Sequence, residues 1–335
     1  MSLISIGDLA HSLLLRNRGT SIKNSINTLT EELSTGKTSA PAKRLGGDYA
    51  HIADIDRKLA RLSGFNVATA EAKLFGEVAQ SALSNIEQNA SNLGSTLSTI
   101  SSYDQDIVRN QSSDQAQTEL LAIAATINIT AGGRSIFAGT RSDGPAIKSG
   151  EVLLTELQSV VAGLTTASDV ISAVDNWFAN PTGFDSVIYS GSSQSLAPVR
   201  ISGSDFAEFS LRADGPVLKS VLRDTALAAL ATDPAHNLNS AEQSKLLVTA
   251  GNRLTNDSTS IIEVRAEIGF IQQKIESAGA QNSATATSLQ IARNTLLAVD
   301  PHVTAVRLQE AQLQLESLYA VTVRTSQLSL VRFLK

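Results

Sequence analysis

Gly36-Lys37-Thr38 has the ending of a phosphate-binding loop and is the first stretch of the sequence whose residue types could do chemistry. The complete pattern needs a glycine five residues before Gly36, because a glycine-rich turn has to surround the phosphate with backbone N–H groups. Glu31 occupies that position. The loop also follows a predicted helix, whereas a nucleotide-binding loop follows a strand. We therefore expect no nucleotide site here.

The histidines and serines give no catalytic or metal-binding pattern either. The four histidines, His11, His51, His236 and His302, are isolated, and their spacing does not allow two of them to bind zinc from one helix. The serine-rich stretches SGSSQSL and SGSDF lack the G-x-S-x-G form of a nucleophile elbow and are typical of turns. Cysteine is absent, which removes thiolate catalysis and Cys-ligated zinc. The sequence therefore predicts a protein that is not an enzyme and needs no cofactor or metal.

The stretch TAGGRSIFAGTRSDGPA, residues 130–146, combines glycines with two arginines. Such a combination can bind an anion, and it can also end a helix and redirect the chain. We favour the second interpretation, because Gly132-Gly133 follow a periodic helical run where a left-handed C-cap is expected. The apolar Ile-Phe-Ala that follows is expected to anchor the segment. An anion site at Arg134 and Arg141 is the alternative.

The composition favours long, slender helices. Of the 335 residues, 42% are hydrophobic but only 4% are aromatic, so small aliphatic side chains supply most of the apolar surface. The net charge of −5 offers no basic face to a nucleic acid. No apolar run is long enough to span a membrane. The first residues carry no basic residue before their apolar part, so we expect no cleaved signal peptide.

The longest regular pattern lies between residues 261 and 299. Apolar residues recur there at alternating spacings of three and four, which is typical of a helix that packs lengthwise against others. Asn282 and Thr285 interrupt this pattern with polar groups. Asp300 and Pro301 then end the helix and start the next one, because aspartate favours the N-cap and proline the first helical position. We expect a bundle core formed by Ile261, Val264, Ile268, Ile271, Ile275, Leu289 and Leu296.

Both chain ends carry one apolar helical face. On the first helix this face comprises Leu15, Ile22, Ile26, Leu29 and Leu33, and on the last helix it comprises Leu308, Leu315, Leu318 and Leu328. A loop rich in glycine and proline follows the first helix, and a long helix is expected over about 49–101. Another helix is expected to begin at Ser112, where Gln115 completes a capping box, and to end at Gly132-Gly133.

The middle of the chain has a different character. Between about 142 and 221, glycine, serine and proline become frequent, and short alternating runs indicate strands. Short helices are expected over 153–164 and 169–179. The predicted fold is mainly α: a long coiled-coil or helical bundle built from both chain ends, with a small inserted α+β domain. The expected domains are the terminal helices 1–48 and 301–335, the bundle 49–141 and 222–300, and the insertion 142–221.

The two ends of the chain resemble the bacterial flagellin family. The motif LTEELSTGK closes the first helix, and RLQEAQLQLESLYAVTVRTSQLSLVRFL closes the chain. The resemblance covers roughly the first 140 and the last 110 residues. Within the family, GGRSIFAGTRSD is similar to the segment of the members that join hook and filament. One departure is TSAPAKRLGGDYAHI, which replaces the family's usual loop after STGK and puts the contacts of that loop in doubt.

The resemblance implies a structural subunit of the bacterial flagellum. As a family member, the protein would be exported unfolded by the flagellar type III apparatus and would lie outside the cell. Its terminal helices would then assemble with other subunits through the two apolar faces described above. The implied partners are copies of itself, hook-associated protein 1, flagellin and a flagellar export chaperone, with no nucleic acid or membrane.

Three roles fit these patterns to different degrees. An adaptor that joins hook to filament is the first choice, because of the segment GGRSIFAGTRSD. A short filament flagellin is the alternative within the family. A cytoplasmic coiled-coil scaffold fits the heptads but not the C-terminal sequence.

Overall fold

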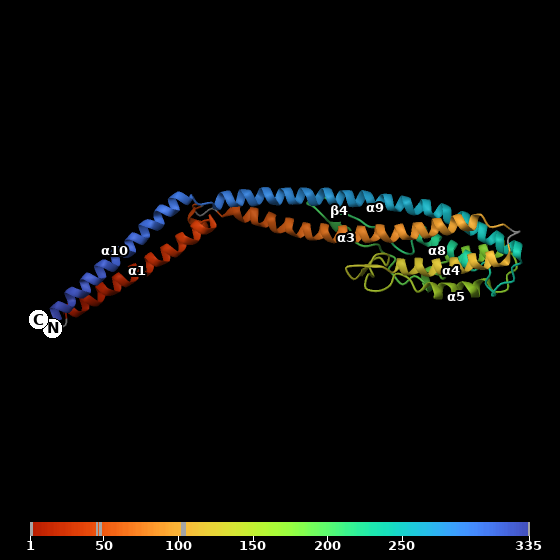
Figure 1. Cartoon of the computed structure of the whole chain (residues 1–335), viewed down its shortest axis with the longest axis horizontal. Coiled ribbons are helices and arrows are strands. Elements are labelled where there is room, and N and C mark those ends of the chain that lie inside the picture. The colour runs from red at the N-terminus through yellow and green to blue at the C-terminus, as the bar shows by residue number, and fades with distance from the viewer. Residues whose placement is uncertain (1–2, 45, 47–48, 102–104, 334–335) are drawn as a thin grey trace. The chain divides into compact units, whose positions relative to one another are not determined.

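The computed structural model describes residues 3–44, 46, 49–101 and 105–333, and this part of the chain is mainly α-helical, as predicted (Figure 1). The helices are α1 (Leu3–Thr35), α2 (Pro41–Arg44), α3 (Ala50–Ser98), α4 (Asp106–Ile127), α5 (Gly150–Val161), α6 (Ala167–Ala179), α7 (Phe184–Val187), α8 (Pro216–Ala229), α9 (Ser240–Leu297) and α10 (Pro301–Phe333). Two antiparallel hairpins complete the fold, β1 (Thr130–Ala131) with β2 (Arg134–Ser135) and β3 (Val199–Arg200) with β4 (Phe206–Ala207).

The chain divides into two compact units. The first comprises residues 1–61 and 284–335, and the second comprises residues 62–283. The first unit thus contains α1 and α10 together with the start of α3 and the end of α9. The domain division expected from the sequence placed its bounds at other residues and remains a prediction.

The heptad pattern of α9 forms much of the core of the second unit. Ile261, Ile268 and Ile275 are buried, and Val264 and Ile271 are half-buried against the same core. The same core contains buried aliphatic side chains of α3 at spacings of three, seven and four residues: Leu83, Ile86, Leu93 and Leu97. The aliphatic composition thus produces lengthwise helix packing.

Asn282 interrupts the heptad pattern because its side chain has a specific partner. The residue is buried, and its Nδ2 donates a hydrogen bond of 2.8 Å to the backbone oxygen of Ile201. Ile201 follows β3, so the amide connects α9 to the β3–β4 hairpin. A buried amide without such a partner would cost free energy.

Helix α4 begins at Asp106, six residues before the predicted start at Ser112. Ser112, predicted as the N-cap, is instead buried inside the helix, as is its neighbour Ser113. Ser113 Oγ lies 2.8 Å from the backbone oxygen of Ala229 and 3.1 Å from that of Ala228, at the end of α8. The hydroxyl thus bonds carbonyls of a helix distant in sequence, a tertiary contact that the local capping pattern did not reveal.

Gly132-Gly133 do not cap a helix, which corrects the prediction. Helix α4 ends at Ile127, and the two glycines form the turn between β1 and β2. Their φ angles are 57° and 80°. A two-residue hairpin turn with both φ angles positive matches the twist of its strands and strongly favours glycine.

The segment after this hairpin is buried, as the sequence predicted. Ile136, Phe137 and Ala138 have no exposed surface. Backbone bonds hold the segment on both sides: the N–H of Ala213 donates to the oxygen of Phe137, and the N–H of Ser192 donates to the oxygen of Ala138, both at 2.8 Å. The segment is therefore the centre around which the middle of the chain packs.

The middle of the chain shares its core with the long helices. Short helices were predicted at 153–164 and 169–179, and α5 and α6 lie close to these bounds. Their apolar side chains belong to the same continuous cluster as those of α3, α4 and α9. Phe209 also lies with its ring centre 4.9 Å from that of Phe75 on α3. Within the described residues, residues 142–221 thus do not form a core of their own.

Candidate assembly surface

The side chains that could bind a metal ion or an anion do not form such a site among the described residues. The described residues contain no group of three or more acidic, histidine or cysteine side chains able to hold a metal ion. None of their helices combines the length and the apolarity needed to cross a membrane. Arg141 Nη1 donates to the backbone oxygen of Ser190 at 3.0 Å, and Arg134 Nε lies 3.4 Å from Ser142 Oγ. Both arginines of the alternative anion site thus donate hydrogen bonds to neighbouring serines of the same chain.

The loop with Gly36-Lys37-Thr38 has a structural role. The N–H of Thr38 donates to the oxygen of Leu297 at 2.9 Å, and the N–H of Val299 donates to the oxygen of Gly36 at 3.1 Å. These two bonds join the end of α1 to the connection between α9 and α10. Gly36 has a φ of 66°, in the left-handed region that favours glycine.

Glu32 strengthens this connection from inside α1. Its Oε1 accepts hydrogen bonds from the N–H and the hydroxyl of Ser39, at 2.8 and 2.9 Å, and from the hydroxyl of Thr38 at 3.2 Å. Partial burial raises the pKa of this carboxyl, but the hydrogen bonds from Ser39 and Thr38 lower it more, so its pKa lies below the usual value. Glu32 is therefore ionised when it accepts these hydrogen bonds, and its carboxylate fixes the position of the loop.

Helix α10 begins as the sequence predicted. Asp300 Oδ1 accepts hydrogen bonds from the N–H groups of His302 and Val303, at 2.8 and 3.3 Å. Pro301 is the first helical residue. The aspartate thus satisfies N–H groups that have no partner within the helix.

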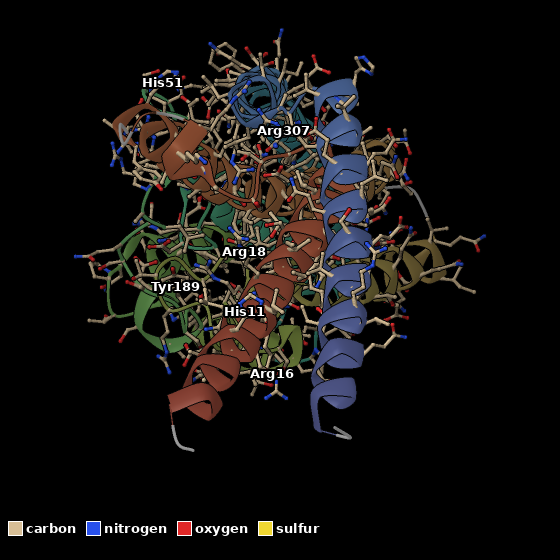
Figure 2. All side chains as sticks on the ribbon, turned by 90° about the vertical axis from the view of Figure 1, so that its left-hand side faces the viewer. His11, Arg16, Arg18, His51, Tyr189 and Arg307 are labelled. Atoms are coloured by element: carbon tan, nitrogen blue, oxygen red, sulfur yellow. The ribbon has the colours of Figure 1, made fainter. Side chains whose placement is uncertain are left out.

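Helices α1 and α10 lie side by side along the first unit (Figure 2). The apolar faces predicted from the sequence lie between them only in part. Four predicted residues of α1 and three of α10 are half-buried: Leu15, Ile22, Ile26, Leu29, Leu308, Leu315 and Leu318. A Cβ at Gly19 would lie 3.4 Å from Leu318 Cδ2, so glycine leaves room for that leucine. The pair thus packs loosely compared with the second unit.

The other predicted residues lie elsewhere. Leu33 is exposed, and the side chain of Leu328 lies outside those that the structure describes. Leu289 and Leu296, expected in the bundle core, are half-buried and belong to the first unit. Contact of the predicted faces with other subunits stays a prediction.

A second apolar face of α10 was not included in the predicted surface. Val303, Val306, Leu313 and Ala320 are exposed, and Leu313 has 62% of its surface accessible. Spacings of three and seven residues place these side chains along one line of a helix. We call them the outer face of α10. The spacing of seven from Val306 to Leu313 was the available sequence signal.

The outer face of α10 turns away from α1. At 100° per residue, Leu313 lies about 140° around the helix from Leu318, whose Cδ2 lies beside Gly19 of α1. Further apolar side chains are exposed on the same pair of helices: Leu13, Leu14, Tyr319, Val321 and Val323. Apolar surface of this extent marks a site for another protein more often than a solvated surface.

Two comparisons with known proteins gave a match and one did not. Residues 252–334 match the model of the bacterial flagellin C-terminal helical region. A solved structure from Vibrio parahaemolyticus, assigned as a flagellar hook-associated protein, matches with a TM-score of 0.51. It is 13% identical, and the alignment covers 75% of this chain and 99% of that chain, so the likeness shows the fold. No curated protein matched the sequence.

The mainly α fold, with its two terminal helices side by side, is similar to the fold of that flagellar hook-associated protein. Residues 252–334 are thus similar to the C-terminal helical region of bacterial flagellin. The match confirms the resemblance to the flagellin family at the C-terminal end of the sequence.

Proposed function

We propose that this protein is the adaptor between hook and filament, the role of hook-associated protein 3, and that it assembles through α1 and α10 after type III export. The observation that carries the assembly part is the outer face of α10, which is exposed among the described residues. A second copy of the protein would bury this face and gain about 25 cal/mol for each Å² of apolar surface removed from water.

The segment GGRSIFAGTRSD supports the adaptor over the filament flagellin by its resemblance to junction members of the family. Its positions have strict structural requirements: Phe137 is fully buried, and Gly139 has a φ of 63°. The further partners that we propose are hook-associated protein 1, flagellin and an export chaperone. The proposed location is the extracellular flagellum.

The role is tested by locating the protein on isolated flagella. Antibodies against the protein should label a short zone at the hook end of each filament, and a deletion strain should retain hooks but lose attached filaments. Label along the whole filament would identify a filament flagellin instead. Label confined to the cytoplasm would contradict both flagellar roles.

A further inference from the structure

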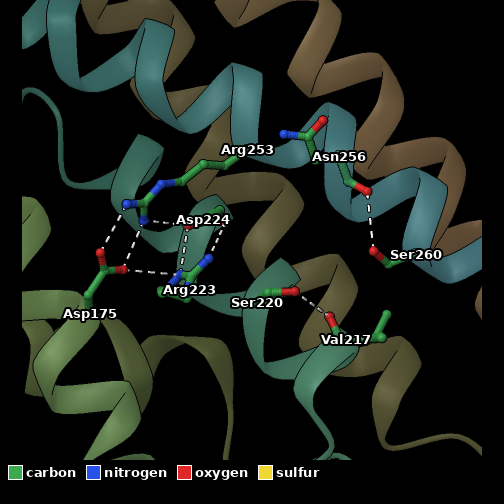
Figure 3. Close-up of polar contacts among 8 residues, drawn as sticks. All are labelled: Asp175, Val217, Ser220, Arg223, Asp224, Arg253, Asn256 and Ser260. Carbon is green, nitrogen blue, oxygen red and sulfur yellow. Dashed lines mark hydrogen bonds and ion pairs between the residues drawn. The ribbon is translucent and has the colours of Figure 1, made fainter.

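A cluster of charged side chains lies where α6, α8 and α9 meet, inside the second unit (Figure 3). Arg253 of α9 bonds Asp175 of α6 with both guanidinium Nη atoms, at 2.8 and 2.9 Å. Arg223 bonds its neighbour Asp224 on α8 at 2.8 and 2.7 Å, and Arg253 Nη1 reaches Asp224 Oδ1 at 3.3 Å. Two arginines and two aspartates thus neutralise one another.

Asp257 adds a third carboxyl group to this balanced set. It lies one turn after Arg253 on α9, is buried, and its Oδ2 accepts no hydrogen bond from the described residues. Asp224, which is only 1% exposed, acts on it from α8. An ionised Asp257 would give the cluster a net charge of −1 beside the buried Asp224, whereas a protonated Asp257 leaves the cluster neutral.

The described residues around Asp257 supply no further cation for it. Arg223 is the basic group of α8 that acts on it, and its guanidinium is already bonded to Asp224. On the adjoining stretch of α3, residues 87–98, the charged side chain is Glu87, which pairs with Arg265 at 3.5 Å. Every facing cation thus has another carboxylate as its partner.

We propose that Asp257 is a pH-sensitive switch in the contact of α8 with α9, which joins the helices as a neutral acid and loosens them as a carboxylate. Burial, and then the charge of Asp224, raise the pKa of Asp257 from 3.8 to about 7, in agreement with this role. The unfolded chain loses this proton near pH 4, but the folded chain keeps it until about pH 7. The contribution of Asp257 to the stability of the fold is therefore fully present below pH 4 and is lost as the pH rises from about 4 to about 7. This inference does not depend on the proposed function.

The test compares unfolding at pH 5 and pH 8 in denaturant for three chains: the natural protein, Asp257→Asn and Asp114→Asn. Asp114 is an exposed residue of α4 and serves as the control. In the natural protein and the control, the unfolding constant should be about tenfold or more larger at pH 8 than at pH 5. Asp257→Asn should lose this increase, because an amide does not titrate. An increase of equal size in Asp257→Asn and in the control would overturn the proposal.

A direct titration keeps the proposal testable if Asp257→Asn does not fold. The carboxyl carbon of Asp257 is followed by NMR in the whole chain labelled with ¹³C-aspartate, and Asp257→Ser identifies its signal by its loss. A midpoint near pH 7 is expected. A midpoint below pH 5 would show that Asp257 is an ordinary ionised carboxylate, and the switch would not exist.

Discussion

Gly139 lies at a position that permits no side chain. Its φ of 63° is in the left-handed region, and a Cβ would collide with the backbone oxygen of Gln194. Gly132 also has a left-handed φ, of 57°, but a Cβ there meets open space. Substitution of Gly132 therefore tests backbone strain alone, whereas substitution of Gly139 tests backbone strain together with a steric collision.

We expect Gly139→Ala to destabilise the protein more than Gly132→Ala. Gly132→Ala should cost about 1 kcal/mol, from the left-handed conformation alone. Gly139→Ala should cost more, because residues around Gln194 have to move as well. Denaturant unfolding of both variants measures the difference. Equal losses would show that the contact with Gln194 adapts freely.

The sequence predicted elements that depend on local patterns. The heptads of α9 and the cap at Asp300 and Pro301 can be recognised because each involves neighbours within a few residues. The start of α4 was predicted wrongly, because Ser112 and Gln115 have the spacing of a capping box, whereas Ser112 is buried within a helix that begins at Asp106. The glycine pair before Arg134 was misread, because the same residues serve a helix cap and a hairpin turn.

The candidate surface was predicted in part for a similar reason. A helical face that packs inside the chain and one that stays free have the same spacing. Leu318 and Leu313 are both apolar residues of α10, yet only Leu318 packs toward α1. The charged cluster could not be predicted, because Asp175 and Arg253 are 78 residues apart in the sequence.

At the scale of the helix, we expect α10 and α9 to respond differently to truncation. Leu313→Ser removes an exposed side chain, so the melting temperature of the free subunit should change little while addition to a growing assembly is strongly reduced. Ile268→Ala removes part of a buried side chain and should cost about 2–5 kcal/mol of stability. Thermal unfolding and a sedimentation assay of assembly measure the two effects. Normal assembly by Leu313→Ser would remove the outer face from the proposed interface.

At the scale of the whole molecule, the two units differ in how completely they bury their apolar side chains. The second unit contains a continuous core with many side chains that have no exposed surface. Among residues 10–35 of α1, each side chain is either exposed or half-buried, and none is fully buried. Helices with so little burial are marginal in water. We therefore expect α1 and α10 to be the least stable elements of a free subunit.

The most direct test of this account is limited proteolysis of the free and the assembled protein with trypsin. Arg16, Arg18, Lys23 and Arg324 are exposed on α1 and α10. In the free subunit these sites should be cut first and leave a resistant fragment that contains residues 62–283. In assembled flagella the same sites should be protected, because neighbouring subunits cover the two helices. Equal cleavage rates at these sites in the free and the assembled protein would contradict assembly through α1 and α10.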